Sequence, residues 1–106
     1  MCYKIEASFI IMHVLKSQDY CTIQNLVEVK KKIESKIPSV YIDVSRRTVL
    51  NSIESFPEIF DFSENKIQKK QDSDVFFEDS VIDYFDFDLE DSIKTRVTSL
   101  LMANAR

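Results

Sequence analysis

The chain of 106 residues contains no glycine, no tryptophan, two prolines, two cysteines and one histidine. Without glycine it cannot contain a glycine-rich phosphate loop or the dinucleotide-binding fingerprint. A turn that needs a positive φ must use Asn or Asp instead. Cys2 and Cys21 are too few for a disulfide framework, and together with His13 they give no paired metal-ligand spacing. We therefore expect reduced cysteines, no metal and no cofactor.

Long apolar runs and a secretory leader are missing as well. The longest apolar stretch, residues 9–15, is interrupted by His13, so no segment is long enough to cross a bilayer. Residues 1–10 lack the layout of a signal peptide. No set of nucleophile, base and acid can be assembled around His13, which we interpret as a core-edge residue. These absences predict an intracellular protein, in the cytoplasm or nucleus, that is neither membrane-bound nor an enzyme.

Charge is unevenly distributed along the chain, whose formal net charge is −4. Residues 1–27 are neutral, residues 28–70 carry +2 and residues 71–106 carry −6. A local positive excess attracts nucleic acid even on an acidic chain, although the acidic total lowers the expectation of DNA binding. The change near residue 70 predicts a domain over residues 1–70 and an acidic, aromatic extension over residues 71–106.

Hydrophobic spacing predicts two helices before Pro38. The first covers residues 4–17 and is apolar around most of its circumference, as is typical of a central core helix. The second begins after Thr22, whose hydroxyl can cap it, and ends at about residue 36 because Pro38 forbids continuation. Lys30 lies within its apolar stripe and must extend its ammonium group outward.

A third helix is predicted from Ser45 to about residue 55, after a loop over residues 39–44. Asp43 and Ser45 are both candidates for its N-cap. Ser45 is the better of the two, because it makes Val44 and Val49 a hydrophobic staple. Pro57 ends the helix.

A β-hairpin is predicted next, from a strand over residues 59–62 and a second strand over residues 66–68. Asn65 is best able to take the left-handed conformation in the connection, which we expect to have three or four residues. Residues 70–80 are interpreted as a linker or a docked strap. A final helix starts at Asp88 and has a single apolar stripe.

The order helix, helix, helix, hairpin within residues 4–69 resembles the winged helix-turn-helix superfamily. The segment over residues 42–53 is similar to the start of a recognition helix, with a polar cap, the basic pair Arg46-Arg47 and the apolar pair Val49-Leu50. The chain departs from the pattern in its long loop before this helix and in its hairpin without glycine. The resemblance implies a mostly α fold with a small antiparallel β-hairpin, and a C-terminal helix added to the winged helix-turn-helix domain.

The resemblance also implies binding of double-stranded DNA by a small transcription regulator. The third helix would enter the major groove, and the hairpin would contact the backbone. The candidate DNA-binding residues are Arg46, Arg47, Thr48, Asn51, Ser52, Ser55, Lys66, Lys69 and Lys70. Small polar residues on a solvated helix face explain several of these positions equally well. The run Lys30-Lys31-Lys32 is interpreted as a solvated helix face.

The alternative function is a protein-interaction module, or a subunit or inhibitor of a larger assembly. Aromatic residues spaced by acids in the extension are typical of a docking peptide: Phe76, Phe77, Tyr84, Phe85 and Phe87. The same stretch could instead cover the basic surface as an autoinhibitory tail, and a virus-encoded DNA mimic is a further variant of this alternative. The final helix packs on the first or pairs with its twin in a dimer, through Ile93, Val97, Leu100 and Leu101.

Overall fold

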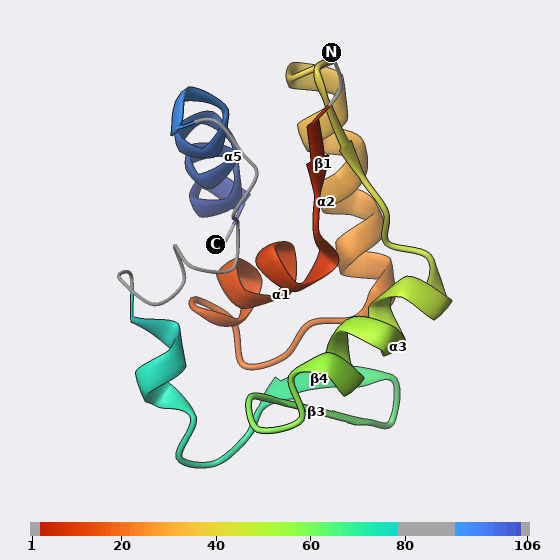
Figure 1. Ribbon diagram of the computed structural model, residues 1–106, viewed down its shortest axis with the longest axis vertical. Coiled ribbons are helices and arrows are strands. Elements are labelled where there is room, and N and C mark those ends of the chain that lie inside the picture. Colours follow the sequence, from red (N-terminus) through yellow and green to blue (C-terminus); the bar gives the residue numbers. More distant parts are fainter. Residues whose placement is uncertain (1–2, 79–90, 105–106) are drawn as a thin grey trace.

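The computed structural model of the protein describes residues 3–78 and 91–104 (Figure 1). Helices and short strands alternate along this part of the chain. The elements in chain order are β1 (Tyr3–Ile5), α1 (Ala7–Leu15), α2 (Ile23–Lys36), β2 (Val40–Ile42), α3 (Arg46–Ser55), β3 (Phe60–Ser63), β4 (Lys66–Lys69), the short 3-10 helix η1 (Asp74–Phe77) and α5 (Asp91–Asn104).

Helix α1 lies at the centre of the molecule, and all nine of its residues are buried. Helices α3 and α5 both pack against it, which explains why nearly its whole circumference is apolar. The predicted start at residue 4 is wrong, because residues 3–5 form β1 and the helix begins at Ala7. Its predicted end at residue 17 is also too late, since the helix ends at Leu15.

Strand β1 pairs in parallel with β2, in the register Tyr3 with Val40 and Ile5 with Ile42. The predicted loop over residues 39–44 therefore contains a strand. Both strands are three residues long, and their pairing joins segments far apart in the chain. A strand of this length depends on its partner, which local sequence patterns do not reveal.

The predicted bounds of α2 and α3 are confirmed. Thr22 Oγ1 accepts a hydrogen bond from the Asn25 N–H at 3.1 Å, and the Thr22 N–H donates to Asn25 Oδ1 at 3.0 Å, which completes a capping box. Ser45 Oγ accepts a hydrogen bond from the Thr48 N–H and caps α3. Val49, on the inner face of α3, is fully buried.

Strands β3 and β4 form the predicted antiparallel hairpin, with Phe60 opposite Lys69 and Ser63 opposite Lys66. The connection has two residues rather than three or four, and both have positive φ: 53° at Glu64 and 61° at Asn65. Positive φ at both central residues is typical of the tight type I′ turn. The left-handed conformation of Asn65 is as predicted, whereas that of Glu64 is a conformation that residue type rarely adopts.

The hairpin is joined to the helices by one further pairing. Cys21, in the connection between α1 and α2, forms an isolated antiparallel bridge with Ile67 of β4. The Cys21 N–H donates to the Ile67 carbonyl at 2.9 Å, and the Ile67 N–H donates to the Cys21 carbonyl at 2.7 Å. The hairpin therefore lies against the helical core (Figure 1).

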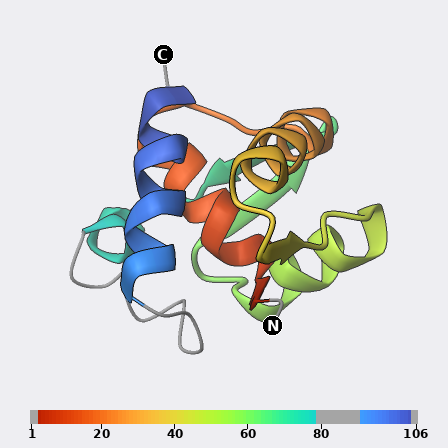
Figure 2. The ribbon, with the colours of Figure 1, turned by 90° about the horizontal axis from the view of Figure 1, so that it is seen from above.

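Helix α5 belongs to the same core as the preceding elements. It packs against α1 and α2 and lies beside α1 in Figure 2, and Val97 and Leu101 on its inner face are buried in one cluster with Ile5 and Phe9. The boundary predicted near residue 70 therefore does not separate two cores among the described residues. The predicted helix start at Asp88 lies outside the described residues.

The described residues form a compact mixed α/β structure with four α-helices, and the radius of gyration over Cα atoms is 12.7 Å. The small antiparallel hairpin is confirmed, while the parallel pair β1–β2 was not predicted. Within the described part, no helix combines the length and the apolar character needed to span a membrane.

Candidate nucleic-acid interface

Helix α3 has an apolar inner face and a polar outer face, as predicted. Val49 and Ile53 are buried, and Leu50 packs against the same core. Arg46, Arg47, Asn51 and Ser55 are exposed, while Thr48 and Ser52 are half-buried. Arg47, Thr48, Asn51, Ser52 and Ser55 therefore share the outer side of the helix. Arg46, three and four residues before Val49 and Leu50, is exposed at the start of the apolar stripe.

The hydroxyl of Thr48 is occupied by the helix cap. Thr48 Oγ1 donates to Asp43 Oδ2 at 2.9 Å and accepts a hydrogen bond from Ser45 Oγ at 3.0 Å. Asp43 Oδ1 accepts a hydrogen bond from the Ser45 N–H at 3.2 Å. The hydrogen bonds from the Ser45 N–H and the Thr48 hydroxyl hold the pKa of Asp43 below its usual value. Thr48 therefore fixes the start of the helix, and an ionised carboxylate lies beside its N-terminus.

The two arginines differ from Thr48 in having no partner among the described residues. Within residues 3–78 and 91–104, the guanidinium groups of Arg46 and Arg47 make no hydrogen bond or ion pair. Arg47 and Asn51 are four residues apart, so they lie on one face of the helix. The Ser55 hydroxyl donates to the backbone carbonyl of Asn51 at 2.9 Å, and the Asn51 side chain is exposed.

The lysines of the hairpin contact aromatic rings. Lys66 Nζ lies 4.6 Å from the ring centroid of Tyr20, and Lys69 Nζ lies 5.2 Å from that of Phe77. Lys69 also forms an ion pair with Asp74 at 3.6 Å. These contacts place the two ammonium groups against the α1–α2 connection and η1, whereas the adjacent Lys70 is exposed.

The predicted docking residues of the extension differ in how far their side chains are buried. Phe77 is buried in the core, which removes its ring from the surface, and Phe76 is half-buried against the same core. The neighbouring Val75 is 54% exposed, so η1 attaches residues 74–77 to the domain as a docked strap. Tyr84, Phe85 and Phe87 lie outside the described residues.

The apolar stripe of α5, which was predicted to form a dimer, packs against other helices of the same chain. Ile93, Val97 and Leu101 are buried, and Leu100 is half-buried against the same core. Because α5 packs on α1 and α2, these side chains are covered without a second copy. Of the two arrangements predicted for the final helix, packing on the first helix is the one observed.

Sequence reasoning missed a side-chain pair that holds β2. Lys30 Nζ donates to the Ile42 carbonyl at 2.7 Å and pairs with Glu34 Oε2 at 2.5 Å. The same carboxylate oxygen accepts a hydrogen bond from the Ile42 N–H at 2.8 Å. Lys30 also lies over the ring of Tyr41 at 4.7 Å. The pair therefore supplies hydrogen-bond partners for the N–H and carbonyl of Ile42 in β2. The sequence signal for it was a lysine and a glutamate four residues apart on a helix.

The segment that builds α3 and the hairpin is not strongly basic. Residues 43–74 contain five basic residues, Arg46, Arg47, Lys66, Lys69 and Lys70. They also contain seven acidic residues, Asp43, Glu54, Glu58, Asp61, Glu64, Asp72 and Asp74. The positive excess of residues 28–70 therefore comes from the lysines of α2, on another element.

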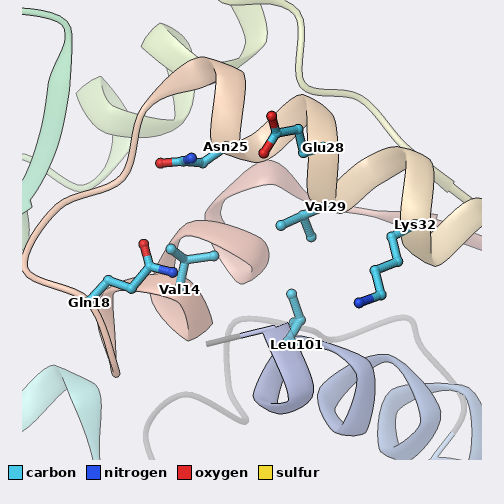
Figure 3. Close-up of a pocket in the computed structure, with 7 residues that line it drawn as sticks. All are labelled: Val14, Gln18, Asn25, Glu28, Val29, Lys32 and Leu101. Carbon is cyan, nitrogen blue, oxygen red and sulfur yellow. The ribbon is translucent and has the colours of Figure 1, made fainter. Parts of the chain in front are cut away.

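The hollow shown in Figure 3 lies between α1, α2 and α5 and has a volume of about 310 Å³. Val14, Val29 and Leu101 supply apolar lining from the three helices. Glu28 and Lys32 add one charge of each sign. The hollow therefore has no net preference for a cation or an anion.

No group of three or more His, Cys, Asp or Glu residues in the described ranges could hold a metal ion. Cys21 is a free, buried thiol, and burial raises its pKa to about 12, so it is protonated at neutral pH. His13 is buried rather than at the edge of the core, and its ring packs against Phe9 with centroids 4.4 Å apart.

Comparisons with models of protein families, with curated proteins and with solved structures found no match to this chain.

Proposed function

We propose that this chain is a winged helix-turn-helix protein that binds double-stranded DNA and acts as a transcription regulator. The observation that carries the proposal is the exposed surface of α3. Arg47 and Asn51 are exposed on its outer face and Arg46 is exposed in its first turn, while Val49 and Ile53 anchor the helix to the core. The hairpin follows α3 and is tied to the core through the Cys21–Ile67 bridge, which supports the winged-helix interpretation.

The first two turns of α3 supply most of the DNA contacts in this proposal. A recognition helix contacts base edges with its N-terminal residues. Arginine pairs best with the major-groove edge of guanine and asparagine with that of adenine, so Arg47 and Asn51 read neighbouring bases. Arg46 and Lys70 contact phosphates on the two sides of the groove. Thr48, whose hydroxyl is held by Asp43, acts by positioning the helix.

The test compares two double variants that each remove two positive charges. Fluorescence anisotropy measures binding of each to a random-sequence duplex of about 20 base pairs, between about 50 and 200 mM salt. We expect Arg46→Ala/Arg47→Ala to lower the affinity at least about tenfold and to reduce its dependence on salt.

Lys36→Ala/Arg96→Ala is the matched control, because these exposed residues lie on α2 and α5. It should bind DNA as the unmodified protein does. Equal losses in both variants would assign the binding to net charge rather than to α3, and no measurable DNA binding at low salt would overturn the proposal.

Protein binding is the second candidate function, and the acidic excess within residues 43–74 favours it. Among the predicted docking residues on described positions, Phe76 is the one that remains accessible, next to the exposed Val75. Under this candidate, Phe76→Ala abolishes a complex recovered by pull-down without unfolding the domain. The Arg46→Ala/Arg47→Ala variant would then retain that complex.

A further inference from the structure

We infer that the groove between α2 and α5 binds a phosphorylated small molecule of the nucleoside monophosphate class. The groove lies where the end of α2 meets the middle of α5, and its volume is about 350 Å³. Its lining consists of Lys36, Ile37, Thr95, Arg96, Ser99 and Leu100.

Two cationic side chains from different helices line this groove, and no described carboxylate lines it with them. Lys36 and Arg96 are exposed, and neither makes a hydrogen bond or ion pair with any residue of the described ranges. Two cations without an acidic partner among the described residues, on one groove of a chain with net charge −4, make a local positive field. That field favours the binding of an anionic ligand in the groove.

The donor groups of the lining residues favour a phosphate over other anions. Arg96 offers a planar fork of donors that matches a phosphate, and Lys36 offers a second charge. The hydroxyls of Thr95 and Ser99, four residues apart on one face of α5, supply further donors.

An apolar side chain distinguishes this groove from a simple phosphate site. Ile37 and Leu100 line it together with the cations. Because Ile37 is 1% exposed, the half-buried Leu100 is the side chain against which an aromatic base buries apolar surface. A phosphate joined to a flat, partly apolar base therefore fits both parts of the groove. The hollow of Figure 3 lacks this character, because Glu28 there balances Lys32.

This site is independent of the proposed DNA interface, since no residue of α3 or the hairpin lines it. The test titrates the full chain with adenosine monophosphate, adenosine and inorganic phosphate, separately, by isothermal titration calorimetry. We expect adenosine monophosphate to bind at least about tenfold more tightly than either of the other two.

Variants of the chain then locate the binding. Lys36→Ala/Arg96→Ala should lose at least about tenfold in affinity for adenosine monophosphate, and Arg46→Ala/Arg47→Ala should bind it as the unmodified chain does. Arg96→Lys, which keeps the charge but not the fork, should give an intermediate affinity. Circular dichroism of each variant checks that its fold is retained.

Several outcomes would overturn the inference. They are no binding of adenosine monophosphate, equal binding of adenosine, equal binding of inorganic phosphate, or unchanged affinity in the Lys36→Ala/Arg96→Ala variant. Because the DNA test uses the same two double variants with the opposite expectation, failure of one proposal is distinguishable from failure of the other.

Discussion

At the scale of single residues, Glu34 contributes a pH-dependent contact to the fold. Partial burial alone would raise the pKa of Glu34, but hydrogen bonds from Lys30 Nζ and the Ile42 N–H outweigh that effect and hold the pKa below its ordinary value of 4.5. A carboxyl group whose pKa is lower in the folded chain stabilises the fold above its unfolded pKa. That contribution is lost as the pH falls through the folded pKa.

We expect Glu34→Gln to remove part of the acid sensitivity of the protein. The amide oxygen can still accept a hydrogen bond from the Ile42 N–H, but it carries no charge to titrate or to pair with Lys30. Urea unfolding at a series of pH values should show the unmodified chain losing more stability below about pH 4.5 than the variant does. Because the side chain of Glu34 is 29% exposed, the difference should stay below about 1 kcal/mol.

The control for this prediction is Glu54→Gln, at an exposed position of α3. Its pH profile should follow that of the unmodified chain. Parallel profiles for Glu34→Gln and Glu54→Gln would contradict the assignment of the acid sensitivity to Glu34.

At the scale of elements, the turn between β3 and β4 is tight, and Glu64 is an unfavourable residue for it. A chain without glycine places Glu64 at a φ of 53° and Asn65 at 61°. Left-handed backbone brings Cβ close to the following carbonyl, which costs Glu64 more than it costs Asn65. The hairpin therefore relies on its ladder and on the Cys21–Ile67 bridge for stability.

Replacing this turn by the preferred pair should stabilise the fold. We expect Glu64→Asn/Asn65→Gly to raise the free energy of unfolding by about 0.5–1 kcal/mol, because both residues then tolerate positive φ. Thermal unfolding followed by circular dichroism measures the change. Ser63→Gly, within β3, is the control and should lower the stability, since glycine weakens a strand. A destabilised Asn-Gly variant would contradict the type I′ interpretation.

At the scale of the whole molecule, α5 completes the core from the far end of the sequence. Its inner face is buried with residues of α1, although the extension over residues 71–106, to which it belongs, carries a net charge of −6. The apolar stripe is consequently an internal surface, and the exposed cations of α3 and of the α2–α5 groove lie on separate elements.

We expect Val97→Ala to destabilise the monomer. Val97 is fully buried, so removing two methyl groups should lower the free energy of unfolding by about 2 kcal/mol. Thr95→Ala, on the exposed side of α5, should change it by less than about 0.5 kcal/mol. Chemical denaturation gives both values, and analytical ultracentrifugation should find both variants monomeric. If Val97→Ala left the free energy of unfolding unchanged but dissociated a dimer of the unmodified chain, the stripe would be an interface between two copies.

The sequence by itself determined the features that depend on neighbours within a few residues. Thr22 and Ser45 fix the starts of α2 and α3 through hydrogen bonds to their own first turns, and Pro38 lies just beyond the end of α2. Asn65 marks the hairpin because its left-handed preference is local. The exposed side of α3 follows from the same helical spacing.

Only the tertiary structure decided which segments meet. Residues 3–5 are a strand because Val40–Ile42 lies beside them, and Lys30 is a structural residue because Ile42 offers it a carbonyl. The stripe of α5 faces α1 rather than a second copy for the same reason. Pairing and burial depend on contacts between distant parts of the chain, which periodicity within one segment does not encode.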